Sequence, residues 1–348
     1  MRTSPLRDKL AALGATFTEQ NGRELVARFT DRAAEYAAVR DNVGLADFSF
    51  VQVFRLPEAK GIDLLDTIVA GNVPRIRFGR VLHTFLADEN GMLVADCYVA
   101  NNDQELIFLC ESIVPDADIT GLLGPDAENL TSTHVLLNLD GARAYEVVKE
   151  TFGPDVLGLP YLSVEVYQFE GTPAYLFRAG KTGEFGYQIL ASVSVAGSLF
   201  DKLYALTQKS GGRCVGFDIH QELRLEGRFF NIHAEGKRVR DPLVLGLQWM
   251  IDLDKENYRG AAAIKARRAA GLKQKIVGIA ADTGLAVGDE VVAICHSDVL
   301  NRSLGLAVLP VETAYSGLSY RLSSGTTVQT ISMPPIMPKS LKVKLDEV

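Results

Sequence analysis

The sequence predicts a mixed α+β protein whose C-terminal part is made almost entirely of strands. Two stretches of the chain show a similar order of strands and helices, one on either side of residue 130. From residue 273 onward, strands and turns follow one another with almost no helical periodicity, which is typical of a small β-barrel or sandwich. Elements grouped in this way indicate the α+β class. The 348 residues are enough for two or three domains.

The first half is predicted to contain two helices and a β-hairpin. Apolar residues at helical spacing, with glycines that end each run, predict helices over 35–43 and 60–69. The turn sequence DENG at 88–91 joins two strand-like stretches and predicts the hairpin. The predicted strand segments of this half are 45–56, 81–86, 92–99 and 105–110.

The second half repeats this order. A helix is predicted over 141–152, and a longer one begins with Ser194 as its cap. Asp218 opens a third helix, with Gln221 at the capping-box position. The predicted strands of this half are 134–139, 162–168, 174–178 and 187–190.

Composition and charge exclude several classes of protein. A net charge of −7 argues against a general nucleic-acid binder, which would carry a basic excess. No apolar run approaches the roughly 20 residues that a membrane span needs, and the N-terminus does not resemble a signal peptide. Four cysteines lie far apart without a CxxC pair, which suits a reducing compartment. A cytoplasmic protein that binds neither membranes nor nucleic acid is therefore expected.

Common catalytic signatures are missing from the sequence. It has no P-loop and no GxGxxG, GxSxG or HExxH motif. His220 and His233 are thirteen residues apart with no cysteine nearby. No metal site is predicted.

The unusual residue of the hairpin is Asp96. Residues 92–99 place apolar side chains on both faces of the strand, which is typical of a buried strand. An unpaired carboxylate there costs several kcal/mol or becomes neutral. Either Asp96 lies at a strand end, solvated or paired with an arginine, or it is kept for a cationic or proton-donating ligand. The register is open, so His83, Thr84 or Phe85 lies opposite it.

A glycine-rich loop carries the second unusual carboxylate. Glu184 lies between Gly183 and Phe185 in the stretch RAGKTGEFGYQI, residues 178–189. Glycines allow a ligand to approach the backbone closely, and a carboxylate can accept two parallel hydrogen bonds from a fork of N–H donors such as the edge of a pterin. The simpler alternative is a hairpin with an exposed glutamate.

The helix after residue 216 carries a polar face. His220, Arg224 and Arg228 are spaced four apart, and Glu222 and Glu226 form a second pair. Basic groups on one face could hold an anion such as a glutamate tail. The alternative is a set of intrahelical ion pairs on a solvated face, each worth only tenths of a kcal/mol.

Seven short stretches, in order along nearly the whole chain, resemble the family of the glycine cleavage T-protein, which includes the tetrahydrofolate-dependent aminomethyltransferases and folate-dependent demethylases. They are VRDNVGLADFS at 39–49, GRVLHT at 79–84 followed by Asn90-Gly91 and Asp96, LNLDGA at 137–142, GKTGEFGYQI at 180–189, LRLEG at 223–227, DPLVLGLQW at 241–249 and YRG at 258–260.

The resemblance implies three domains arranged as a cloverleaf around a central folate cavity. The expected first domain is a discontinuous α+β unit of residues 1–50 and 131–245. The second is an α+β domain of residues 51–130. The third comprises residues 246–348 and is mainly a β-barrel from about residue 273.

The resemblance also implies roles for single residues. In the family, the acid at the position of Asp96 faces the reactive nitrogens of the folate and the one-carbon donor, and the glutamate at the position of Glu184 binds the pterin. Asp96 and His83 are therefore the expected catalytic residues. The expected folate-binding residues are Glu184, Arg178, Tyr187, Arg224, His220 and Lys181.

Several positions depart from the family pattern. Ala95 replaces the first acid of an Asp pair, and His83 and Lys181 each replace a tyrosine. His220-Gln221 replaces an Arg-Asp pair. The permanent positive charge of the family's arginine is thus replaced by the imidazole of His220, a group that titrates near neutrality.

These features predict a transferase that moves a methyl or aminomethyl-derived unit from a small N-, S- or O-methyl donor to tetrahydrofolate, its cosubstrate. One alternative is the glycine cleavage aminomethyltransferase itself, which needs a lipoyl-carrier protein as partner. Another is a folate-binding protein without transfer activity. Relatives of that kind carry a KGCYxGQE motif, whose cysteine is missing from GKTGEFG at 180–186.

Overall fold

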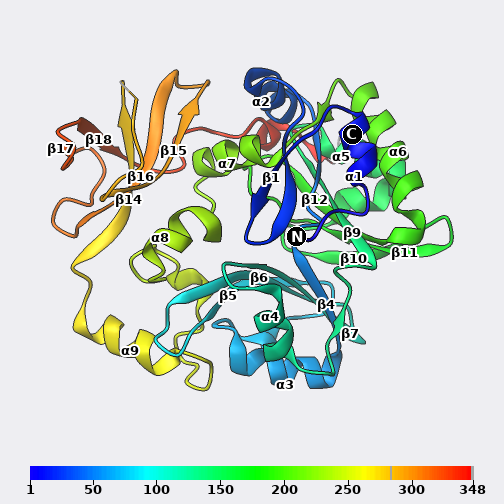
Figure 1. The fold of residues 1–348 in the computed structure, drawn as a ribbon, viewed down its shortest axis with the longest axis horizontal. Helices are drawn as coiled ribbons and strands as arrows, with labels where there is room; N and C mark the ends of the chain where they lie inside the picture. The colour runs from blue at the N-terminus through cyan, green and yellow to red at the C-terminus, as the bar shows by residue number, and fades with distance from the viewer. Residues whose placement is uncertain (283, 346–348) are drawn as a thin grey trace.

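The computed structural model describes residues 1–282 and 284–345, and Figure 1 shows three lobes. Residues 52–129 form the lobe at the bottom of this view, residues 134–214 most of the lobe at the right, and residues 274–331 the strands at the left. Short helices between residues 217 and 250 lie between the lobes. The mixed architecture confirms the predicted α+β class.

The lower lobe is an antiparallel sheet covered by two helices. In spatial order its strands are β5 (Val81–Ala87), β6 (Leu93–Asn101), β7 (Glu105–Ser112), β4 (Gln52–Pro57) and β8 (Glu128–Asn129). Helices α3 (Glu58–Ile68) and α4 (Asp116–Leu123) pack their apolar side chains on one face of this sheet. Every residue of β6 is buried, as its two-sided apolar pattern predicts.

The right lobe is a six-stranded sheet. Its order is β10 (Val164–Phe169), β11 (Thr172–Phe177), β12 (Gly186–Ser192), β9 (His134–Asp140), β3 (Gly44–Asp47) and β13 (Arg213–Cys214). Helices α5 (Ala144–Phe152) and α6 (Val193–Lys209) bury their apolar side chains against it. The chain leaves this sheet after β3, builds the lower lobe, and returns at β9, which pairs with β3.

The sheets of these two lobes share a hydrophobic core. Side chains from β5, β6 and β7 meet side chains from β9, β11 and β12 in one buried cluster, which includes Tyr98, Leu109, Leu136, Tyr175 and Phe177. One face of β6 therefore points toward the neighbouring lobe, and its other face points toward α3 and α4. This arrangement places the middle of β6 at the junction of two lobes.

The C-terminal strands form a third sheet. Their order is β15 (Val291–Ser297), β16 (Arg302–Pro310), β14 (Gln274–Ala281), β18 (Thr327–Ile331) and β17 (Ser319–Arg321). All neighbours are antiparallel. The proposed division into three domains is compatible with these three sheets and remains a proposal.

The remaining elements frame the junction. They are α1 (Arg7–Ala12), β1 (Thr16–Gln20), β2 (Arg23–Arg28), α2 (Arg32–Asp41), α7 (Phe217–Glu226), a π-helical turn (Ile232–Gly236), α8 (Lys237–Val239) and α9 (Ala261–Ala270). Among the described residues, no helix combines the length and apolar character that crossing a bilayer requires. All four cysteines are buried as free thiols.

Two predicted helix starts were wrong by a few residues. Helix α6 is capped by Ser192, whose hydroxyl accepts a hydrogen bond from the Ser194 amide, so Ser194 lies in the first turn. Helix α7 begins after Gly216, whose amide donates to the Glu35 carboxylate at 2.9 Å. Asp218 is therefore a first-turn residue, because a glutamate from another helix occupies the end of α7.

Candidate functional site

The register of the β5–β6 hairpin brings His83 to Asp96. Phe85 is the residue directly opposite Asp96, and His83 pairs with Tyr98 two residues further along. Residues two apart on a strand point to the same face, so the His83 and Asp96 side chains are diagonal neighbours. The imidazole Nε2 lies 2.7 Å from Asp96 Oδ1.

Asp96 is buried and has partners on both carboxylate oxygens. Its side chain is 1% exposed. The Lys181 ammonium, from the glycine-rich loop before β12, donates to Oδ2 at 2.6 Å. Since an ionised carboxylate only accepts, the hydrogen in the contact to Oδ1 belongs to His83 Nε2. The strand-end alternative is excluded, because Asp96 is in the middle of β6.

Asp96 and Lys181 are both charged. Burial by itself would raise the pKa of Asp96, but the nearby Lys181 and His83 outweigh it and lower this pKa to about 2. Burial likewise opposes the charge of Lys181, yet Asp96 and Glu111 hold the pKa of the ammonium well above its ordinary value. The charge pair thus persists across the physiological pH range.

The row of polar groups continues beyond Lys181. The ammonium also donates to Glu111 Oε1 at 3.3 Å, and Glu111 Oε2 lies 3.9 Å from His233 Nε2. Glu111 is the residue of β7 opposite Asp96. His233 lies in the π-helical turn, a rare element that often occurs at functional sites. Its Nε2 is buried without a hydrogen-bond partner among the described residues.

Burial of His233 predicts a stability change at mildly acidic pH. Burial lowers the pKa of His233 from 6.5 to about 4. Between these values the unfolded chain binds a proton that the folded chain does not, so the free energy of unfolding falls as pH falls, by about 3 kcal/mol. His233→Gln should therefore flatten the dependence of unfolding free energy on pH from 7 to 4, as measured by urea unfolding. The control is His296→Gln at an imidazole that is 48% exposed, and equal slopes for both variants would contradict the prediction.

A pocket opens on the His83 side of this row. Its volume is about 340 Å³, and we call it the His83 pocket. It is lined by His83, Tyr161, Leu162, Arg228, Phe229, Phe230, Leu245, Gly246, Leu247 and Trp249. His83 stacks on Tyr98 with ring centroids 4.2 Å apart, and the Trp249 ring meets it edge-on at 5.2 Å. The volume and the aromatic walls suit a small planar ligand.

A smaller chamber lies on the Lys181 side. Its volume is about 30 Å³, and its walls include Glu111, Asp140, Lys181 and His220. His220 Nε2 lies 3.2 Å from Asp140 Oδ2, and Nδ1 lies 2.9 Å from the Gly216 carbonyl. This space has room for water only, so a larger ligand would have to move its walls.

The Glu184 carboxylate is fully engaged by the chain itself. Arg40 donates to Oε1 at 3.0 Å, and the Lys339 and Ser340 amides donate at 3.1 and 2.8 Å. Glu184 lines neither the His83 pocket nor the Lys181 chamber. Its observed contacts join the glycine-rich loop to α2 and to the C-terminal segment.

The other predicted folate-binding side chains are also tied internally. Arg178 donates to the Gly186 carbonyl at 3.0 Å and its guanidinium lies over the Tyr187 ring. Arg224 lines the chamber but donates to both Glu235 oxygens, at 2.6 and 2.7 Å. Tyr187 belongs to the core of the right lobe, although its hydroxyl is buried without a partner among the described residues. The structure brings together Asp96, His83 and Lys181, and leaves the other predicted residues outside their direct contacts.

Comparison with known proteins identifies the family. A family model described as the GCVT N-terminal domain matches residues 6–255. The chain belongs to the GCVT family. This assignment confirms the resemblance on which the predicted fold depends.

Individual relatives of this GCVT-family chain are aminomethyltransferases. That of a Parafrankia species is 26% identical over 367 residues, covering 98% of this chain and 99% of the relative. That of Mycobacterium tuberculosis is 27% identical over 325 residues, covering 87% and 86%. A solved structure of glycine cleavage system aminomethyltransferase T from Bartonella henselae superposes with a TM-score of 0.81 at 19% identity, covering 97% of this chain and 98% of that one. The last comparison confirms the predicted T-protein-like fold.

Sequence reasoning did not assign four residues to the candidate site. They are Glu111, Tyr161, His233 and Trp249. Glu111 directly follows the apolar stretch predicted as a strand over 105–110, and a carboxylate next to a buried strand was an available signal, as it was for Asp96. Trp249 is the only tryptophan of the chain. Tyr161 and His233 carry no local signal that separates them from ordinary core residues.

Proposed function

We propose that this protein transfers an aminomethyl-derived one-carbon unit to tetrahydrofolate, as in glycine cleavage. The observation that carries the proposal is the ionised, buried Asp96, held between His83 and Lys181 beside a pocket with aromatic walls. The relatives are named aminomethyltransferases. The protein is accordingly an enzyme of the transferase class, with tetrahydrofolate as its cosubstrate.

The His83 pocket is the proposed folate site. Tyr161, Phe229 and Trp249 offer flat apolar surfaces to the fused ring of the cosubstrate. His83 and Arg228 are the charged or titratable groups that line this pocket, and Asp96 is hydrogen-bonded to His83 from outside it. A folate nitrogen bound at His83 would therefore have a proton acceptor within reach.

Lys181 is the proposed acid for the leaving group. In the transfer, the donor C–S bond breaks, its electron pair passes to sulfur, and the sulfur takes a proton from the Lys181 ammonium. The methylene carbon becomes bonded to two folate nitrogens, which each lose a proton, while the donor amine leaves as ammonia. One of these protons returns to Lys181 through Asp96, 2.6 Å away. The other leaves with the ammonia.

A second candidate function is methyl transfer from a small N-, S- or O-methyl donor. One observation favours it: Lys181 already supplies the positive charge that Asp96 needs, so the donor itself need not be cationic. In that case Lys181 would protonate the departing heteroatom, and the folate nitrogen would lose one proton.

The partners and the compartment follow from the same proposal. Aminomethyl transfer requires a lipoyl-carrier protein as donor, whereas methyl transfer requires only a small methylated compound. Cytoplasmic localisation is proposed from the dispersed thiols of the chain.

A transfer assay tests the proposal. The purified protein is mixed with tetrahydrofolate and an aminomethylated lipoyl carrier, and methylene-tetrahydrofolate and ammonia are measured. Parallel reactions contain methylated amines, sulfonium compounds or aryl methyl ethers, with methyl-tetrahydrofolate as the product measured. Product from the carrier supports the first function, and product from a methylated compound alone supports the second. Folate binding without any product would indicate a folate-binding protein without transfer activity. That result would contradict both transferase functions.

A further inference from the structure

The Lys181 chamber has a buried hydrogen-bond acceptor without a partner. Asn138 lines this chamber and its side chain is completely buried. The amide oxygen Oδ1 of Asn138 accepts no hydrogen bond from any of the described residues. Buried polar atoms in native proteins are almost always satisfied, and one without a partner points to a ligand or water that donates to it.

The amide group of Asn138 is held in one orientation by its own NH₂ group. Nδ2 donates to Asp140 Oδ2 at 2.6 Å and lies 3.3 Å from His220 Nε2. His220 Nδ1 lies 2.9 Å from the Gly216 carbonyl, which only accepts, so Nδ1 carries the hydrogen of the neutral ring and Nε2 accepts from Asn138. Since both N–H groups of the amide are used, Oδ1 is left for a donor from the chamber.

The chamber also has an excess of negative charge. The carboxylates of Glu111 and Asp140 line it, and Lys181 is the cation between them. Lys181 is shared, because it donates to Asp96 at 2.6 Å and to Glu111 at 3.3 Å. Arg224 is the other cation on the wall, and a buried glutamate neutralises it. Three carboxylates thus face one available ammonium group, and a buried excess of this kind favours a bound cation.

The size of the chamber limits this cation to a small one. A volume of about 30 Å³ admits a ligand of the size of water. Within residues 1–282 and 284–345, no three or more histidine, cysteine, aspartate or glutamate side chains are arranged to hold a metal ion. Gln188 lines the chamber as well and adds a second amide oxygen. A small cation that donates hydrogen bonds fits these walls better than a metal ion does.

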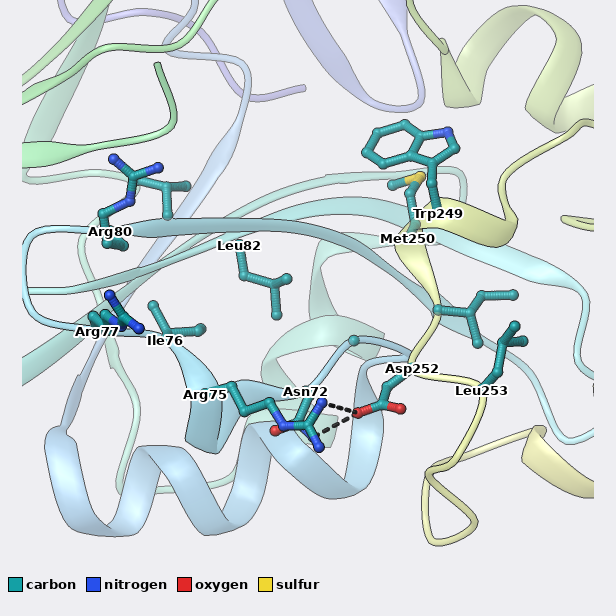
Figure 2. A pocket seen from close by; sticks show the side chains of 13 residues that line it. Asn72, Arg75, Ile76, Arg77, Arg80, Leu82, Trp249, Met250, Asp252 and Leu253 are labelled. Carbon is teal, nitrogen blue, oxygen red and sulfur yellow. Dashed lines mark hydrogen bonds and ion pairs between the residues drawn. The ribbon is translucent and has the colours of Figure 1, made fainter. Parts of the chain in front are cut away.

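The wide pocket on the other side of the site has the opposite charge. It shares Trp249 with the His83 pocket and has a volume of about 610 Å³. Figure 2 shows Arg75, Arg77 and Arg80 on its walls. Its one carboxylate, Asp252, is paired with Arg75. A small cation formed at the site is therefore disfavoured in this pocket and favoured in the Lys181 chamber.

We propose that the Lys181 chamber binds the ammonium ion that aminomethyl transfer releases, an inference that rests on the proposed function. Ammonia in water near neutral pH is mostly ammonium, an ion of nearly the size of water. Its N–H groups can donate to Asn138 Oδ1, to Glu111 and to the Gln188 amide oxygen. Lys181 is both the proposed acid of the transfer and a wall of the chamber, so the amine departs next to this site.

Urea unfolding of the full-length protein tests the site without folate or donor. The salts are ammonium chloride, potassium chloride and tetramethylammonium chloride at one ionic strength. We expect the urea midpoint to rise in a saturable way with ammonium only, because a ligand that binds the folded state alone stabilises it. Tetramethylammonium carries the same charge but is too large for the chamber. Equal midpoints in ammonium and tetramethylammonium would overturn the proposal, and an equal response to potassium would do so by indicating a general monovalent-cation site.

Two variants locate the bound ammonium. Glu111→Gln removes one negative charge from the chamber, and Asn138→Ala removes the unpartnered oxygen. The matched control is Glu19→Gln at an exposed position of β1. We expect ammonium to bind at least tenfold more weakly to both chamber variants and unchanged to the control. Wild-type affinity in both chamber variants would place the ion elsewhere and contradict the proposal, and the comparison of salts in the wild type decides even if a variant does not fold.

Product inhibition separates this inference from the proposed function. In the transfer assay with the aminomethylated carrier, added ammonium chloride should inhibit more strongly than potassium chloride, and Asn138→Ala should weaken this inhibition. Ammonium binding by a protein that transfers nothing would uphold the chamber site and refute the proposed function. Transfer from the carrier without ammonium-specific binding would uphold the function and refute the chamber site.

Discussion

Asp96→Asn is expected to lower the turnover of one-carbon transfer at least 100-fold while folate still binds. A carboxamide fits the same space but carries no charge, so it can neither accept a proton from folate nor return one to Lys181. The His83 pocket keeps its walls, since Asp96 is not among its lining residues. Turnover is measured with the donor that the transfer assay identifies, and folate affinity by calorimetry.

An exposed aspartate provides the control for this variant. Asp63 lies on the exposed side of α3, so Asp63→Asn changes the net charge equally without touching the site. Asp63→Asn should keep wild-type turnover. If Asp96→Asn were also within threefold of the wild type, proton transfer through Asp96 would be wrong.

Lys181→Met is expected to lower the free energy of unfolding at pH 7 by about 2–3 kcal/mol and to abolish turnover. The substitution leaves Asp96 buried with its charge unbalanced, and breaking one side of a buried pair is costly. The size of this loss in unfolding free energy follows from the shift of the Asp96 pKa from 3.8 to about 2. A shift of slightly less than two pKa units corresponds to about 2.4 kcal/mol.

The stability difference between the wild type and Lys181→Met should depend on pH. The folded-state pKa of Asp96 is depressed, so its stabilising contribution is complete above about pH 4 and is lost as pH falls toward 2. The deficit of the variant should therefore be full at pH 7 and smaller at pH 3. Urea unfolding at both pH values measures it.

A surface lysine provides the control for this second variant. Lys60 pairs with Asp126, but these side chains are 65% and 56% exposed. Lys60→Met should cost less than about 1 kcal/mol, as is usual for exposed pairs. Equal stability of Lys60→Met and Lys181→Met at pH 7 would show that Lys181 is not the counter-ion of Asp96.

The sequence predicted much of the fold because its signals are local. Alternation over 92–99 identified a buried strand, and β6 is buried along its whole length. Glycines and apolar spacing located α3 and α5 to within three residues at each end. The N-terminal α1, β1 and β2 and the helices α4 and α9 were not predicted.

The partners of Asp96 were less predictable. The register that brings His83 to it depends on hairpin geometry, which the turn sequence left open. Lys181 is 85 residues away, and its contact exists only because the right lobe packs on the lower one. The resemblance marked position 181 as a departure from the family pattern, and geometry alone revealed that its ammonium reaches Asp96.

Glu184 illustrates the opposite case. The glycine-rich loop predicted a carboxylate that faces a ligand, whereas the observed partners are Arg40 and the backbone of residues 339 and 340. These partners come from both ends of the sequence, where no local pattern points to residue 184. A role of Glu184 in pterin binding remains a prediction.

The return of the chain from the lower lobe affects how the protein is made. Asp47 of β3 pairs with Leu137 of β9 in the six-stranded sheet, so the pairing partner of β3 is synthesised about 90 residues later. Until β9 is synthesised, β3 has no strand on the β9 side. The lower lobe, residues 52–129, is synthesised before β9 and can fold first. Synthesis therefore favours an order in which the lower lobe folds before the six-stranded sheet is complete. Slow folding of the lower lobe would delay formation of that sheet and lengthen the time during which chaperones are needed.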